Sequence, residues 1–212
     1  MSSAAHCTGA IIAGGRATRF GGAAKGLELV GGTRVIDRVA AALRESCDEV
    51  IIVANDPAAA EWIPGVRVVT DVRPGFGALG GVHAALTSAH RATAATETPA
   101  ATIVLAWDSP FVPGALLRAL RDAGEAAGAD AAVPTSNSPW GFEPLCAWYR
   151  ASCAAIIERH LDSGDLHAGS WLRDVNAIQV NSSPWGDPDE IFFNVNSAED
   201  LAMADSLARR PR

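Results

Sequence analysis

One lysine stands out among the residues that could do chemistry. Lys25 is the single lysine of a chain with sixteen arginines, and it follows the glycine-rich run 13–24, which also holds Arg16 and Arg19. A lysine ammonium is a compact point charge that suits a phosphate, and backbone N–H groups in a glycine-rich loop can surround an anion. The residue types and their order therefore predict a loop that binds a phosphate-bearing ligand.

Two common glycine motifs do not fit this run. A P-loop places glycine directly before its lysine and Ser or Thr directly after it, whereas Lys25 lies between Ala24 and Gly26. The dinucleotide fingerprint G-x-G-x-x-G is also absent from this turn. The run is therefore a longer phosphate loop of a different kind.

Three polar side chains follow apolar runs that look like strands. Asp108 ends one such run, and Asn55 and Asp71 follow two others. Ligands of open parallel sheets bind at the carboxyl ends of the strands. A carboxylate at such an end needs a partner, so we expect Asp108 either to hold a hard cation such as Mg²⁺ or to cap a turn. Asn55 and Asp71 are candidates for nucleotide contacts or for turn formation.

The elements that must position these residues alternate along the chain. Strands are expected at 7–13, 49–54, 66–70, 102–107, 131–134 and 177–181, and helices at 34–45, 81–91, 114–127, 149–162 and 197–208. This alternation predicts an α/β fold, Rossmann-like, with three α/β/α layers around a mostly parallel sheet. The length of 212 residues fits a single domain over 1–212.

Composition narrows the choice of partner and compartment. The formal net charge is −7, although residues 1–46 carry six cations against three acids. This balance disfavours nucleic acid and anionic membrane as partners and suits a small polyanion captured locally. The four cysteines lack C-x-x-C spacing, and no apolar run is long enough to span a bilayer, so we expect reduced thiols and a cytoplasmic protein.

Four segments, taken in order, resemble the molybdenum cofactor guanylyltransferases. They are residues 12–25 with the glycine loop, 71–81, 106–111 around Asp108, and 193–201 with its Asn-Val-Asn sequence. The resemblance spans most of the chain and implies a nucleotidyltransferase-type fold. It also implies Mg²⁺-dependent transfer of GMP from GTP to the phosphate of molybdopterin, with or without bound molybdenum, and release of pyrophosphate.

The resemblance also assigns roles to individual residues. Lys25, Arg19 and Asp108 would be catalytic, with Lys25 and Arg19 on the triphosphate and Asp108 on Mg²⁺. The nucleotide would contact Ala13, Gly14, Gly15, Lys25, Asn55, Asp71 and Asp108. The acceptor would contact Gly80, Gly81, Arg173, Asn194 and Asn196.

Two tryptophans lie near Pro and Gly residues, apart from these roles. Trp140 and Trp185 are expected to pack against the core, with a pocket for a flat ring as the alternative.

Two other functions stay open at this point. The chain could be a cytidylyltransferase that acts on molybdopterin or on a small alcohol phosphate, although the second glycine of 13–15 favours GTP by resemblance. It could instead bind nucleotide without turnover and contact a molybdoenzyme or its chaperone. Only Arg173 remains in the segment 164–173, where the family commonly places several arginines, so the resemblance leaves room for another phosphate-bearing acceptor.

Overall fold

A seven-stranded sheet forms the centre of the protein in a computed structural model that describes residues 6–13, 25–93 and 100–210. The strand order is β5-β4-β1-β6-β8-β7-β9. The bounds are β1 (His6–Ile12), β4 (Glu49–Val53), β5 (Arg67–Val69), β6 (Ala100–Ala106), β7 (Ala131–Pro134), β8 (Cys146–Arg150) and β9 (Ala177–Val180). Neighbouring strands are parallel except where β8 pairs with β6 and β7. The predicted mostly parallel α/β sheet is confirmed.

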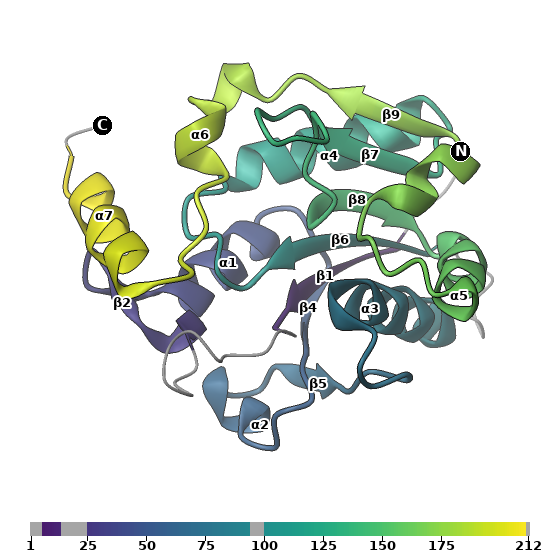
Figure 1. Cartoon of the computed structure of the whole chain (residues 1–212), viewed down its shortest axis with the longest axis horizontal. Helices are drawn as coiled ribbons and strands as arrows, with labels where there is room; N and C mark the ends of the chain where they lie inside the picture. Colours follow the sequence, from purple (N-terminus) through teal and green to yellow (C-terminus); the bar gives the residue numbers. More distant parts are fainter. Residues whose placement is uncertain (1–5, 14–24, 94–99, 211–212) are drawn as a thin grey trace.

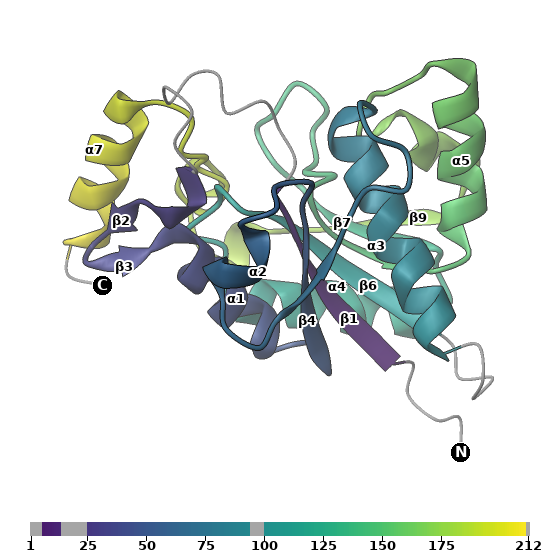
Figure 2. The same cartoon turned by 90° about the horizontal axis from the view of Figure 1, so that it is seen from below.

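Helices cover both faces of this sheet (Figure 2). α1 (Val35–Arg44) and α4 (Gly114–Ala126) pack on one face, and α3 (Gly77–Thr93) and α5 (Cys153–Ser163) pack on the other. Side chains alternate along β1, so Cys7 and Ile11 join the core under α1 and α4, whereas Ala10 and Ile12 join the core under α3 and α5. A central strand buried on both faces explains the unbroken apolar sequence of β1.

A smaller unit lies beside the sheet and contains the C-terminal helix. The hairpin of β2 (Leu29–Val30) and β3 (Thr33–Arg34) packs against α7 (Ala198–Ala208), and the two lie together at one side of Figure 1. Val30, Val35, Phe111, Val195 and Ala204 form its own apolar core. The remaining short elements are α2 (Ala59–Trp62), α6 (Pro188–Ile191) and the 3₁₀ turns Lys25–Leu27, Ser170–Asp174 and Ser183–Trp185.

The prediction of a helix over 149–162 is wrong about where the helix begins. Residues 149 and 150 belong to β8, and α5 begins only at Cys153. Trp148 and Tyr149 are fully buried in the sheet, one in each of the two main cores. Helix α3 also begins at Gly77 rather than at 81. The other predicted strands and helices agree with the structure to within a residue or two at their ends.

The structure shows the four cysteines as free thiols, without disulfide bonds. Cys7, Cys47, Cys146 and Cys153 are free thiols, and three of them are buried. Within the described residues, no helix has both the length and the apolar character needed to cross a membrane.

Hydrogen bonds beyond the ends of the strands hold the site-bearing segments together. The amide of Ala13 donates to Val53 O at 2.9 Å, and that of Trp107 donates to Ile12 O at 3.2 Å. Ala54 N donates to Val69 O at 3.0 Å in the same way. The residues that follow β1, β4, β5 and β6 therefore meet at one edge of the sheet.

Candidate active site

The centre of this edge is an ion pair between two of the predicted catalytic residues. Lys25 Nζ contacts Asp108 Oδ2, and the side chains are 18% and 13% exposed, respectively. Lys25 begins the turn after the glycine-rich run, and Asp108 follows β6. Because both charges are largely removed from water, solvent screens their attraction less than it would at the surface.

Local packing explains why the chain brings Lys25 to this position. Gly26 lies against the indole ring of Trp107, and a Cβ at Gly26 would overlap that ring. Trp107 in turn stacks on Trp62, with ring centroids 5.1 Å apart. Only glycine at this position lets the backbone beside Lys25 approach Trp107 so closely, and Trp107 directly precedes Asp108.

The C-terminal segment completes the centre. Asn196 Oδ1 accepts a hydrogen bond from Lys25 Nζ at 2.8 Å. Val195 N donates to Asp108 O at 2.9 Å, and Ser109 Oγ donates to Asn194 Oδ1 at 2.7 Å. Three segments far apart in the sequence therefore meet at one point.

A second group of predicted residues lies on the β4 and β5 side of this centre. Asn55 Nδ2 donates to Asp71 Oδ2 at 2.8 Å, and Asp71 N donates to Asn55 Oδ1 at 2.9 Å. Burial raises the pKa of Asp71 above its usual 3.8, and the hydrogen bond from Asn55 opposes that change. The side chain is therefore a partly desolvated acceptor fixed in place by its neighbour.

Gly80 and Gly81 belong to this second group. An added Cβ would lie 3.7 Å from Asp71 Oδ1 at Gly81 and 4.0 Å from Asp71 Oδ2 at Gly80. The predicted acceptor role of these two glycines is not tested, but the structure places both beside a residue assigned to the nucleotide.

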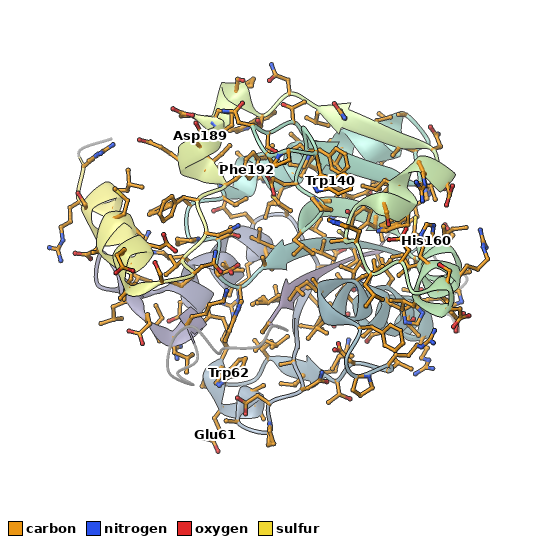
Figure 3. All side chains as sticks on the ribbon, in the orientation of Figure 1. Glu61, Trp62, Trp140, His160, Asp189 and Phe192 are labelled. Atoms are coloured by element: carbon orange, nitrogen blue, oxygen red, sulfur yellow. The ribbon has the colours of Figure 1, made fainter. Side chains whose placement is uncertain are left out.

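A cavity of about 330 Å³ opens on the other side of Asp108. Its polar lining includes Asp108, Ser109, Glu143, Asn194 and Asn196. Trp140, Phe142, His167 and Phe192 supply ring-bearing walls. Figure 3 shows Trp140 and Phe192 near one another on this side of the protein.

The two tryptophans considered from sequence differ in their positions. Trp140 is 47% exposed and lines this cavity, so its expected role in packing alone is not what the structure shows. Trp185 is partly buried and packs against the main core, as expected, and it lines a different cavity.

The remaining predicted residues fall into two groups. Gly14, Gly15, Arg16 and Arg19 lie outside the described residues. Arg173 is described, but its side chain is 70% exposed, lies 3.6 Å from Asp165 Oδ2 and does not line the cavity beside Asp108. Its predicted contact with the acceptor stays a prediction.

Sequence reasoning did not find Gly26, Ser109 or Glu143. Two of them lie next to residues that it singled out, because Gly26 follows Lys25 and Ser109 follows Asp108. Nothing in the sequence marks Glu143 as a site residue, because the pairing of β7 with β8 is what brings it to the cavity.

The mainly parallel sheet, with a lysine and an aspartate in contact beyond its strand ends, has the architecture of an α/β nucleotidyltransferase, as the family model and the solved structures below show. Residues 9–179 match the family model described as the MobA-like NTP transferase domain. This match covers most of the chain, so the protein belongs to that family.

Individual relatives agree with this assignment. The chain is 33% identical to a molybdenum cofactor guanylyltransferase of Desulfosudis oleivorans, over 97% of each chain. It is 35% identical to a probable molybdenum cofactor guanylyltransferase of Chloroflexus aggregans, over 92% of each. The crystal structure of molybdopterin-guanine dinucleotide biosynthesis protein A from Archaeoglobus fulgidus superposes with a TM-score of 0.73 at 27% identity, covering 94% of this chain and 97% of that one.

Proposed function

We propose that the protein transfers the GMP moiety of GTP to the phosphate of molybdopterin. An oxygen of the acceptor phosphate forms a bond to the α-phosphorus of GTP, and the bond from that phosphorus to the bridging oxygen breaks. Pyrophosphate leaves with the electron pair, and molybdopterin guanine dinucleotide is the product. The names of the Desulfosudis and Archaeoglobus relatives support both the nucleotide and the acceptor.

The observation that carries this proposal is the meeting of Lys25, Asp108 and Asn196. The ammonium of Lys25 is held by one carboxylate and one amide oxygen, so it is positioned before substrate arrives. When the triphosphate binds, its oxygens replace Asp108 as partners of the ammonium. A preorganised cation stabilises the charge that develops on the transferring phosphoryl group, which is the main contribution expected of the protein in such a reaction.

The chemistry of Asp108 also fits the predicted Mg²⁺. The described residues contain no group of three or more His, Cys, Asp or Glu side chains that could hold a metal ion. Magnesium does not require one, because one or two carboxylates together with substrate phosphates and waters complete its octahedron. Asp108 supplies such a carboxylate, and Asn196 adds an amide oxygen beside it. When bound, Mg²⁺ would supply additional neutralisation of phosphate charge.

Asn55 and Asp71 serve the base and ribose of GTP in this proposal. Their mutual hydrogen bonds fix the side chains on the β4 and β5 side of the ion pair. Gly80 and Gly81 are buried residues of α3 beside Asp71, where an added Cβ would lie 3.2 Å from Phe76 Cβ or from Ile12 Cγ2, so the absence of a side chain lets α3 pack closely behind Asp71.

The two alternatives are not favoured. The relatives are named as guanylyltransferases, which disfavours a cytidylyltransferase. A protein that only bound nucleotide would not need both a lysine and an aspartate positioned at the strand ends. Contacts with molybdoenzymes or their chaperones stay predictions, as does the cytoplasmic location.

A substrate panel tests the proposal. The purified protein is incubated with molybdopterin and GTP, CTP or ATP, with and without Mg²⁺, and the products are identified by mass. We expect the dinucleotide and pyrophosphate only with GTP and Mg²⁺. Preferential use of CTP would assign the chain to the cytidylyltransferases, and nucleotide binding without pyrophosphate release would support the non-catalytic alternative.

A further inference from the structure

The charges on the cavity beside Asp108 disfavour a phosphate in its interior. Asp108 and Glu143 are its two carboxylates, and no lysine or arginine of the described residues lines it. Lys25 partners Asp108 at the edge of the cavity, whereas the described residues show no ion pair for Glu143, so an anion in the interior would face the charge of Glu143. The interior therefore suits a ligand that donates hydrogen bonds.

The walls of the cavity suit a flat ring. The rings of Trp140 and His167 lie 4.6 Å apart, and those of Trp140 and Phe142 lie 6.3 Å apart. Both pairs are tilted, so the aromatic rings form the sides of a recess rather than a single stack. A planar heterocycle can contact such rings by offset or edge-to-face packing.

The loop between β7 and β8 holds Glu143 in this recess. Glu143 N donates to Pro134 O at 3.3 Å, and Cys146 N donates to Glu143 O at 3.1 Å. Within the loop, Ser136 N donates to Gly141 O at 3.0 Å. The backbone on both sides of the carboxylate is therefore fixed without a ligand.

The carboxylate of Glu143 also needs hydrogen-bond donors. Burial raises the pKa of Glu143 above its usual value, while the hydroxyl groups of Ser136 and Ser138 lower it by hydrogen bonding. Each hydroxyl has a single proton, and Ser136 Oγ also donates to Ser138 Oγ at 2.9 Å while Ser138 Oγ donates to Phe142 O at 3.0 Å. The two serines therefore cannot saturate the carboxylate, which has about four lone-pair sites. A ligand with two parallel N–H donors would satisfy the rest.

We propose that Glu143 is a specificity-determining residue that recognises the amino-pyrimidinone edge of the acceptor's pterin ring. The amino group on C2 and the N3–H of the ring donate to the two carboxylate oxygens, and the ring lies against Trp140 and Phe142. Asp108 and Asn196 line the same cavity and also contact Lys25, so the acceptor's phosphate would extend toward Lys25. This inference rests on the proposed function.

Guanine presents the same edge, but the position of the cavity favours the acceptor. Asn55 and Asp71 do not line it and lie toward β4 and β5, whereas Glu143 lies next to β8 on the opposite side of β6. In Figure 3, Trp140 and Trp62 lie on opposite sides of the protein.

Two ring probes test the recognition without turnover. Binding of 6,7-dimethylpterin and 6,7-dimethyllumazine to the full chain is measured by fluorescence titration near neutral pH. The lumazine carries a carbonyl oxygen where the pterin carries the C2 amino group, so it places an acceptor against the carboxylate. We expect wild type to prefer the pterin by about tenfold or more, since the lumazine would place a carbonyl oxygen against a half-buried carboxylate and leave its hydrogen bond unmade. Equal binding of the two rings would overturn the proposal.

Glu143→Gln is the matching variant, and Glu61→Gln is its control. Glu61 is an exposed residue of α2, remote from the cavity in Figure 3. Glu143→Gln should lose most of the preference for the pterin over the lumazine and raise the KM for molybdopterin by about tenfold. Its dissociation constant for GTP should stay within about twofold of wild type, and Glu61→Gln should match wild type throughout.

These measurements distinguish recognition of the acceptor's pterin from recognition of guanine. They also distinguish failure of this inference from failure of the proposed function. Weaker binding of GTP with unchanged pterin binding would mean that Glu143 recognises guanine, which overturns the proposal. An unchanged KM for molybdopterin in an active Glu143→Gln enzyme would refute this inference and leave the proposed function intact. Failure of wild type to use molybdopterin at all would refute both.

Discussion

Lys25 and Asp108 neutralise each other in a largely buried ion pair at the carboxyl edge of the sheet. Each is also the residue best suited to a substrate phosphate or a divalent cation. The pair therefore keeps two opposite charges partnered inside the protein until substrate supplies new partners. In the proposed reaction, the Lys25 ammonium exchanges Asp108 for phosphate oxygens.

Lys25→Ala should reduce turnover far more than stability. Loss of a preorganised cation at the transferring phosphate should lower kcat by roughly a hundredfold or more. Removal of Lys25 leaves Asp108 without its cation in a largely buried site, so we expect a Tm lower by several degrees in a protein that is still folded at the assay temperature. Rate of pyrophosphate release and Tm are measured together, with Arg44→Ala, an exposed cation at the end of α1, as the control. An unchanged rate would remove Lys25 from the mechanism.

Asp108→Asn distinguishes metal binding from a purely structural role. Asparagine keeps the size of the side chain and can still accept a hydrogen bond from Lys25, but it lacks the charge that a hard cation requires. We expect a Tm lower by a few degrees, because Lys25 loses its counter-charge but keeps a hydrogen-bond acceptor, and roughly a hundredfold lower turnover, partly restored by high Mg²⁺. Asp122→Asn, on the exposed side of α4, is the control. Full activity at ordinary Mg²⁺ would exclude a metal role for Asp108.

Asn196→Ala and Asn194→Ala should differ in their kinetic effect. Asn196 contacts Lys25 directly, so its loss should lower kcat by about tenfold through poorer positioning of the ammonium. Asn194 contacts Ser109 and lines the cavity, so its loss should mainly raise the KM for the acceptor. Steady-state kinetics with GTP saturating measures both. The reverse pattern would contradict the contacts on which this assignment rests.

Asp71→Asn should show a pH-dependent gain in stability together with weaker GTP binding. Burial raises the pKa of Asp71 in the folded protein above 3.8, so the folded state binds more protons just above that pH than the unfolded state does. The stability of wild type therefore falls as pH rises through the folded pKa, whereas an asparagine does not titrate. The Tm of the variant relative to wild type should be higher near pH 7 than near pH 4.

Titration calorimetry with GTP measures the second effect expected of Asp71→Asn, which is weaker nucleotide binding. Removal of a charged acceptor from the ribose and base side should weaken GTP binding by about tenfold. Asp122→Asn again serves as control for both measurements. A Tm difference that does not change with pH, or GTP affinity equal to wild type, would count against the environment or the role assigned to Asp71.

Much of the fold could be predicted because its signals are local. The apolar runs of β1, β4 and β6 and the periodic helices α1, α4 and α7 are visible in sequence without tertiary information. β8 was not, because the short run Cys146–Arg150 adjoins a helical pattern and such runs do not distinguish a buried strand from a buried helix.

Two glycines mark the turn of the β2–β3 hairpin in the sequence. Gly31 and Gly32 lie between its two strands with φ of 59° and 80°, the left-handed conformation that two-residue hairpin turns require. A pair of glycines between short apolar runs predicts such a turn. The hairpin forms part of the support for α7, which follows the segment of Asn196.

The residues at the centre of the site can be predicted from the sequence, but the contacts among them cannot. The sequence predicts Lys25, Asp108 and Asn196 as site residues, but it places Asn196 with the acceptor, whereas the structure places it on Lys25. Its contact with Lys25 depends on how the C-terminal segment returns to β6, through the hydrogen bond from Val195 to Asp108. A link of that kind between distant segments leaves no periodic trace in the sequence.

A single-turnover experiment with labelled GTP follows the α-phosphorus through the reaction. GTP radiolabelled at the α-phosphorus or at the γ-phosphorus is incubated with wild type, Mg²⁺ and molybdopterin in a single turnover. We predict that the α-label appears in a molybdopterin dinucleotide and that the γ-label appears in pyrophosphate. Release of the γ-label as inorganic phosphate, or retention of the α-label in free nucleotide, would contradict guanylyl transfer.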